Sequence, residues 1–207
     1  MPVDLKALLD PRTTALLMME CQEGIIGGGG KLGALGEAVV RHGTVGQIAR
    51  VLAAARAAKV PAFHCTMARR PDGGGAVVNC LLLGATKKSS GPGLLPGSAQ
   101  WKPVAELAPA ANDYVLTRYH GISPFHGTEL DQLLRNLGVR TVVAAGVSVN
   151  VGVLAMTIEA VNAGYQVVIP REAVTGTPDE YVDAVLQHTL RLLATIAPVG
   201  EVVEAWR

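Results

Sequence analysis

The segment TVVAAGVSVNVGV, residues 141–153, joins an apolar run to a glycine-containing turn and to the start of a helical pattern. Residues 141–145 carry no charge and are mostly valine and alanine, as in a strand buried on both faces of a parallel sheet. Residues 153–163 continue as a helical pattern that ends at Gly164. This order predicts a strand–turn–helix unit whose turn lies at the carboxyl end of the strand.

The same alternation of strand and helix extends in both directions from this unit. It predicts strands at residues 15–19, 61–65, 114–117, 166–169 and 195–199, and helices at residues 45–59, 130–137 and 178–193. We therefore predict an α/β fold: a doubly wound, Rossmann-like, six-stranded and mainly parallel sheet with helices on both faces. In such folds ligands bind at the carboxyl ends of the strands.

The chain is long enough for one well-buried domain, and we predict a single domain over residues 1–207. Residues 21–43 and 67–112 depart from the alternation and are rich in glycine, so we predict two long loops of the kind that cover or bind ligands.

Residues 27–30 are four glycines followed by Lys31. Ile25 and Leu32 stand where a phosphate-binding loop needs glycine and Ser or Thr, which favours a flexible loop over a nucleotide site.

The composition limits the class of partner. Apolar residues make up 49% of the chain and charged residues 17%, which excludes disorder, and the formal net charge of +1 does not favour nucleic acid or an anionic membrane. No apolar run approaches the roughly 20 residues that span a bilayer, and no secretory leader pattern is present. We expect a cytoplasmic protein that takes a small-molecule substrate, and its apolar content predicts a homodimer or larger homo-oligomer.

The cysteines and histidines show no metal-binding or disulfide spacing. Cys21, Cys65 and Cys80 are odd in number and lack a CxxC pair, so we interpret them as reduced thiols. We expect no metal and no cofactor, and assign His64, His120 and His126 to surface or loop hydrogen bonds. Cys21 and Cys65 follow strands, which leaves two interpretations open: inert packing, or a displaced nucleophile.

Three positions fall at predicted strand ends, where this fold gathers a site. They are Glu20, Arg118 and the turn at Gly152. An acid beside an arginine can transfer a proton and hold an anion. It can equally form a structural salt bridge, and the spacing alone leaves both alternatives open.

Residues 146–153 resemble the signature turn of the isochorismatase-like (cysteine hydrolase) superfamily. Arg118 and the segment SPFHGTEL at residues 123–130 resemble the family's lysine-containing strand end and the segment that follows it. The resemblance covers residues 11–199. It implies the strand order 3-2-1-4-5-6 and a cis peptide bond between Val147 and Ser148.

Members of this family usually carry Asp, Lys and Cys as the catalytic set, and these positions fall on Glu20, Arg118 and Gly152. Glycine cannot form a thioester, so the resemblance implies a divergent member that lacks the nucleophilic cysteine. Members with glycine there, the true isochorismatases, cleave a vinyl ether by acid protonation. The resemblance therefore implies a hydrolase of a small, carboxylated metabolite, with Glu20 as acid or base and Arg118 holding the anion.

Four further residues of the matching segments are candidates for binding the substrate: Gln22, Phe125, Ser148 and Asn150. Backbone N–H groups of the turn that carries Ser148 and Asn150 could also face a ligand. The alternative to a hydrolase is an inactive member of the family that binds a small ligand or serves as an assembly subunit.

Overall fold

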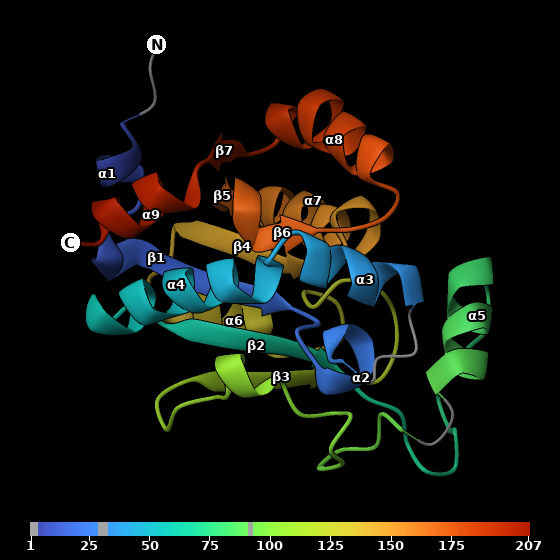
Figure 1. Cartoon of the computed structure of the whole chain (residues 1–207). Coiled ribbons are helices and arrows are strands. Elements are labelled where there is room, and N and C mark those ends of the chain that lie inside the picture. The colour runs from blue at the N-terminus through green and yellow to red at the C-terminus, as the bar shows by residue number, and fades with distance from the viewer. Residues whose placement is uncertain (1–3, 29–32, 91–92) are drawn as a thin grey trace.

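In the described part of the chain, seven parallel strands form one sheet with helices on both faces (Figure 1). The computed structural model describes residues 4–28, 33–90 and 93–207. The strand order is β3-β2-β1-β4-β5-β7, and the short β6 pairs with β4, so the predicted order is confirmed with β7 as the predicted sixth strand. The strands are β1 (Thr14–Met19), β2 (Ala62–Met67), β3 (Tyr114–Arg118), β4 (Thr141–Val147), β5 (Gln166–Pro170), β6 (Val174–Thr175) and β7 (Thr195–Ala197).

The alternation of side chains along β1 shows how the two faces are covered. Leu16 and Met18 belong to one buried cluster, which includes residues of α4 and α9, whereas Leu17 and Met19 belong to a second, which includes residues of α6, α7 and α8. No helix in the described ranges has the length and apolar content to cross a membrane. The helices are α1 (Leu5–Leu8), α2 (Glu23–Ile26), α3 (Gly33–Arg41), α4 (Thr44–Ala57), α5 (Leu81–Ser90), α6 (Leu130–Asn136), α7 (Leu154–Asn162), α8 (Asp179–His188) and α9 (Val199–Ala205).

The structure differs from the sequence prediction in the two glycine-rich stretches. The first contains α2 and α3, and the second contains α5 and a 3₁₀ turn at Ala105–Leu107, so neither is only a loop. Glycines interrupt the apolar pattern of these short helices, which hides them from a periodicity argument. The interpretation of the four-glycine run as a flexible loop falls largely on residues 29–32, which lie outside the described residues.

Element ends at the carboxyl terminus also differ. The predicted helix at residues 178–193 is divided into α8 and a 3₁₀ turn at Leu190–Leu192. The last strand ends at Ala197, because Pro198 caps the start of α9.

The turn after β4 has the conformation that the resemblance implies. The Val147–Ser148 peptide bond is cis, and Val149–Val153 forms a π-helical turn that continues into α7. Gly146 has a φ of +102°, and a Cβ built there would lie 2.2 Å from the carbonyl oxygen of Met19. Only glycine allows this approach of β4 to the end of β1.

Candidate functional site

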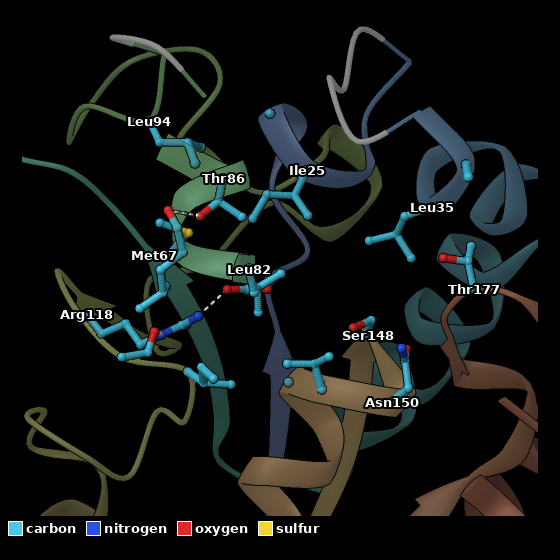
Figure 2. A pocket seen from close by; sticks show the side chains of 18 residues that line it. Ile25, Leu35, Met67, Leu82, Thr86, Leu94, Arg118, Ser148, Asn150 and Thr177 are labelled. Atoms are coloured by element: carbon cyan, nitrogen blue, oxygen red, sulfur yellow. Dashed lines mark hydrogen bonds and ion pairs between the residues drawn. The ribbon is translucent and has the colours of Figure 1, made fainter. Parts of the chain in front are cut away.

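A cavity of about 310 Å³ opens at the carboxyl ends of the central strands (Figure 2). Residues that end or follow β1, β2, β3 and β4 line it, which is where ligands bind in doubly wound folds. Its polar lining consists of Glu20, Thr86, Arg118, Ser148, Asn150 and Thr177.

Aliphatic side chains form most of the remaining wall. Ile25 of α2, Leu35 of α3 and Leu82 of α5 come from helices that periodicity did not reveal, and Figure 2 shows them around the opening. The three consecutive leucines at residues 81–83 were the available sequence signal for this wall. The other aliphatic lining residues are Ala34, Met67, Leu83, Leu94, Ile122 and Val151.

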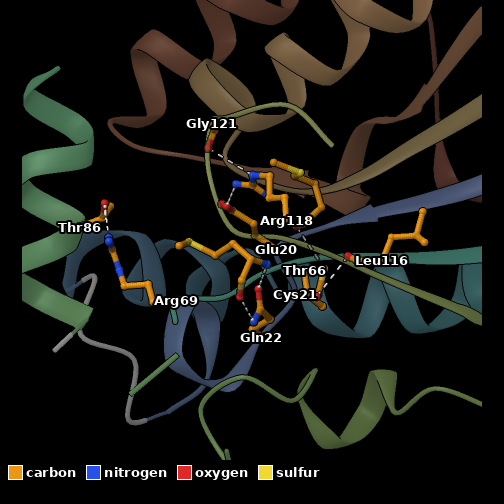
Figure 3. A network of polar contacts seen from close by, with 11 residues as sticks. Glu20, Cys21, Gln22, Thr66, Arg69, Thr86, Leu116, Arg118 and Gly121 are labelled. Carbon is orange, nitrogen blue, oxygen red and sulfur yellow. Dashed lines mark hydrogen bonds and ion pairs between the residues drawn. The ribbon is translucent and has the colours of Figure 1, made fainter. Parts of the chain in front are cut away.

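Glu20 and Arg118 meet at the polar end of this cavity, as the strand-end prediction requires (Figure 3). Arg118 donates from Nη2 to the Glu20 carboxylate and from Nε to the Gly121 carbonyl oxygen, at 3.3 Å. The Arg118 side chain is 5% exposed and the Glu20 side chain 18%. Nη1 of Arg118 is buried without a hydrogen-bond partner in the described part of the chain. One nitrogen of the guanidinium is therefore left without a partner among the described residues, at the wall of the cavity.

Glu20 adopts a backbone conformation that is uncommon outside glycine. Its φ is +53°, and its N–H donates to the Cys65 carbonyl oxygen at 3.0 Å, so the neighbouring strand β2 helps to hold it. A left-handed non-glycine residue costs on the order of 1–3 kcal/mol and persists only where the surroundings enforce it. The chain thus bends directly after β1, at the residue that presents the carboxylate.

Gly152 lies in the cavity wall, and a side chain there would require its neighbours to shift. A Cβ built there would be 3.0 Å from the Cε of Met19 and 3.0 Å from the carbonyl oxygen of Val147. Met19 is fully buried at the end of β1. The methionine therefore occupies space that a larger residue at position 152 would need.

Ser148 and Asn150 point toward the cavity from the turn after β4 (Figure 2). The Oδ1 atom of Asn150 is buried and has no hydrogen-bond partner among the described residues. This oxygen is an unused acceptor. Both residues line the cavity, and their binding role stays a prediction.

Gln22 and Phe125 do not line the cavity, so the structure does not support the predicted binding roles. Gln22 Nε2 donates to the carbonyl oxygens of Met67 and Trp101, at 2.9 and 2.8 Å, and its Oε1 accepts from the Met67 N–H at 2.8 Å. The side-chain amide of Gln22 therefore links the loop around Trp101 to β2 by hydrogen bonds. Phe125 packs against the second buried cluster, with its ring centroid 6.0 Å from that of Tyr165.

None of the three cysteines lines this cavity. Cys21 and Cys65 are buried, and Cys80 is exposed. Burial raises the pKa of Cys65 to about 12 and raises that of Cys21 further. Both buried thiols therefore stay protonated near neutral pH. Within the described ranges, no group of three or more His, Cys, Asp or Glu side chains is placed to hold a metal ion.

Comparison with known proteins places this chain in a family. The isochorismatase domain profile matches residues 14–201. The chain is 28% identical over 197 residues to the uncharacterized isochorismatase family protein YecD of Escherichia coli O157:H7, covering 95% of this chain and 98% of that protein. It is 35% identical over 156 residues to the ureidoacrylate amidohydrolase RutB of Methylobacterium radiotolerans, covering 69% of this chain and 59% of RutB.

A solved structure is similar over almost the whole chain. The isochorismatase family protein from Desulfovibrio vulgaris superposes with a TM-score of 0.81 at 27% identity, covering 93% of this chain and 97% of that one. The family profile, the YecD protein and the solved structure each match most of this chain. The chain therefore belongs to the isochorismatase family.

Proposed function

We propose that this protein hydrolyses a small, carboxylated metabolite without a cysteine nucleophile. The observation that carries the proposal is the meeting of Glu20 and Arg118 in the cavity beside Gly152, where Met19 fills the space of a larger side chain. Because Gly152 offers no nucleophile, water attacks the substrate directly. Arg118 stays protonated at all ordinary pH values, so Glu20 is the group that accepts or delivers the proton.

A carboxylated substrate agrees with the polar end of the cavity. Arg118 is buried and retains one unpartnered N–H nitrogen, and a charge-assisted hydrogen bond to a carboxylate would satisfy it. The relative RutB is named as a ureidoacrylate amidohydrolase, and ureidoacrylate is a carboxylate. The aliphatic wall accommodates the apolar body of such a molecule.

The test compares the wild-type protein with Glu20→Gln in a metabolite mixture followed by mass spectrometry. We expect the wild type to consume at least one carboxylated compound and form a product that has gained water. Removal of a general acid or base slows turnover by roughly 10²–10⁴-fold, so Glu20→Gln should leave that compound almost unchanged. Glu23→Gln is the matched control, because Glu23 lies three residues away and does not line the cavity. Equal turnover by wild type and Glu20→Gln would exclude this role for Glu20.

A second function, ligand binding without catalysis, is favoured by one observation. Glu20 and Arg118 neutralise each other, as in a structural ion pair that no reaction disturbs. In that case the wild-type protein retains a compound from the mixture and releases it unchanged. Loss of stability in both Glu20→Gln and Arg118→Ala, with no change in affinity for the retained compound, would also support this alternative.

A further inference from the structure

A small alcove adjoins the main cavity on the side of Arg118. It has a volume of about 20 Å³ and shares Met67, Leu83, Arg118 and Gly121 with the cavity wall. A single water needs on the order of 10–15 Å³ of such space, so the alcove has room for about one or two water-sized atoms. It is therefore large enough for the polar head of a small molecule and too small for the molecule itself.

Two guanidinium groups line this alcove, from Arg69 and Arg118. Arg69 follows β2 and donates from Nη2 to Thr86 of α5 at 3.1 Å (Figure 3). Its Nε is buried and, like Nη1 of Arg118, has no hydrogen-bond partner among the described residues. Both arginines line the alcove, and each has one buried nitrogen without a partner in the described part of the chain. A buried donor left unpaired is unfavourable, and a ligand acceptor would remove that cost.

The charges around the alcove do not balance. Its lining includes no Asp or Glu, and Glu20, the one carboxylate in the lining of the adjoining cavity, is paired with Nη2 of Arg118. In the described part of the chain, Arg69 forms no ion pair. The next residue, Arg70, differs because it is exposed and pairs with Asp72 at 2.7 Å. The two linings together therefore carry two arginines against one carboxylate, an excess of one positive charge that an anion would neutralise.

We propose that the alcove is the anion subsite of the cavity and that Arg69 determines specificity for a carboxylate. The carboxylate accepts from Nε of Arg69 and Nη1 of Arg118, and the apolar body of the same molecule lies against the aliphatic wall. This inference rests on the proposed function, because it states where the substrate's carboxylate binds. It assigns to Arg69 a binding role that its position after β2 did not suggest.

Equilibrium binding of two unreactive probes tests the subsite. Cyclohexanecarboxylate supplies an apolar ring and a carboxylate, and nitrocyclohexane has the same shape without the charge. In ligand-observed NMR titrations, the wild type should bind the carboxylate at least about tenfold more tightly than the nitro compound, as expected for charge-assisted hydrogen bonds. Arg69→Gln should weaken carboxylate binding by about tenfold or more and leave nitrocyclohexane binding unchanged. Arg70→Gln, the matched control, should change neither.

Three results would overturn the subsite. They are no carboxylate binding, equal wild-type affinity for the two probes, and equal carboxylate affinity in Arg69→Gln and Arg70→Gln. If Arg69→Gln does not fold, the carboxylate affinity of Arg69→Lys and the wild-type preference for the carboxylate probe test the subsite instead. Lysine keeps the charge and loses the planar fork. The probes contain no bond to hydrolyse, so the outcome is separate from that of the metabolite experiment. Arg69-dependent binding of the carboxylate probe, without turnover in the metabolite experiment, would support the subsite and contradict the proposed hydrolase activity.

Discussion

At the scale of single residues, the contact between Gly152 and Met19 predicts a measurable change in stability. Gly152→Ala should lower the free energy of unfolding by about 1–3 kcal/mol, because the added methyl meets Met19 and the rigid carbonyl of Val147. Adding Met19→Ala removes one of these two obstacles. The double variant should therefore be more stable than the sum of the two single changes predicts. Urea unfolding of the three variants measures this coupling.

Gly46→Ala is the control for that experiment. Gly46 lies inside α4, and a Cβ built there meets nothing within 4 Å. Alanine should stabilise the protein by roughly 0.5–1 kcal/mol relative to glycine in a helix. Strict additivity of Gly152→Ala and Met19→Ala would show that the methionine does not limit position 152.

At the scale of elements, a buried histidine connects β2 with the start of β3. The ring of His64, 1% exposed, lies with Nε2 3.2 Å from the carboxylate of Asp113, which Arg56 of α4 also contacts. Burial lowers the pKa of His64, although the hydrogen bond to Asp113 opposes this shift. The unfolded chain then binds a proton near pH 6.5 that the folded chain does not bind until the pH is lower.

This arrangement predicts that the contribution of neutral His64 to the free energy of unfolding is fully present above about pH 6.5. The contribution falls as the pH drops below that value. The slope contributed by His64 is at most about 1.4 kcal/mol per pH unit. Urea unfolding between pH 7.5 and 5.5 should show the loss, and His64→Gln should flatten it. His188→Gln, at an exposed position at the end of α8, should keep the wild-type slope. A wild-type slope in His64→Gln would assign the effect to other groups.

The elements that form the sheet could be predicted from sequence because each strand is a short apolar run with a helix after it. β6 could not, since two residues give no pattern, and α2, α3 and α5 are short helices beside or containing glycines. At the site, the strand ends led to Glu20 and Arg118, which meet in the cavity wall, and their catalytic roles stay predictions. The resemblance suggested Gln22, but it does not determine which way a side chain points, and Gln22 bonds to the backbone instead. The role proposed for Arg69 had no sequence signal, since it depends on which side chains the fold brings around it.

At the scale of the whole molecule, exposed apolar side chains predict self-association. Val77, Val78 and Leu81 lie on the segment around the start of α5 and are 53%, 51% and 90% exposed. Surfaces of this kind commonly mark contacts between proteins. We expect light scattering at micromolar concentration to give at least twice the chain mass of 21.5 kDa. Leu81→Lys should reduce the mass toward that of one chain.

Leu192→Lys is the control for this measurement, because Leu192 is 81% exposed in the 3₁₀ turn after α8 and belongs to a different part of the surface. It should leave the mass unchanged. A mass of 21.5 kDa for the wild-type protein would contradict association through any surface.

The packing of Met19 against Gly152 also bears on how this protein can change over evolutionary time. A single codon change that places cysteine at position 152 does not by itself create a reactive thiol, because the new side chain enters occupied space. The geometry of such a thiol would depend on the residue at position 19, because Met19 lies against position 152. Positions 19 and 152 are therefore expected to change together.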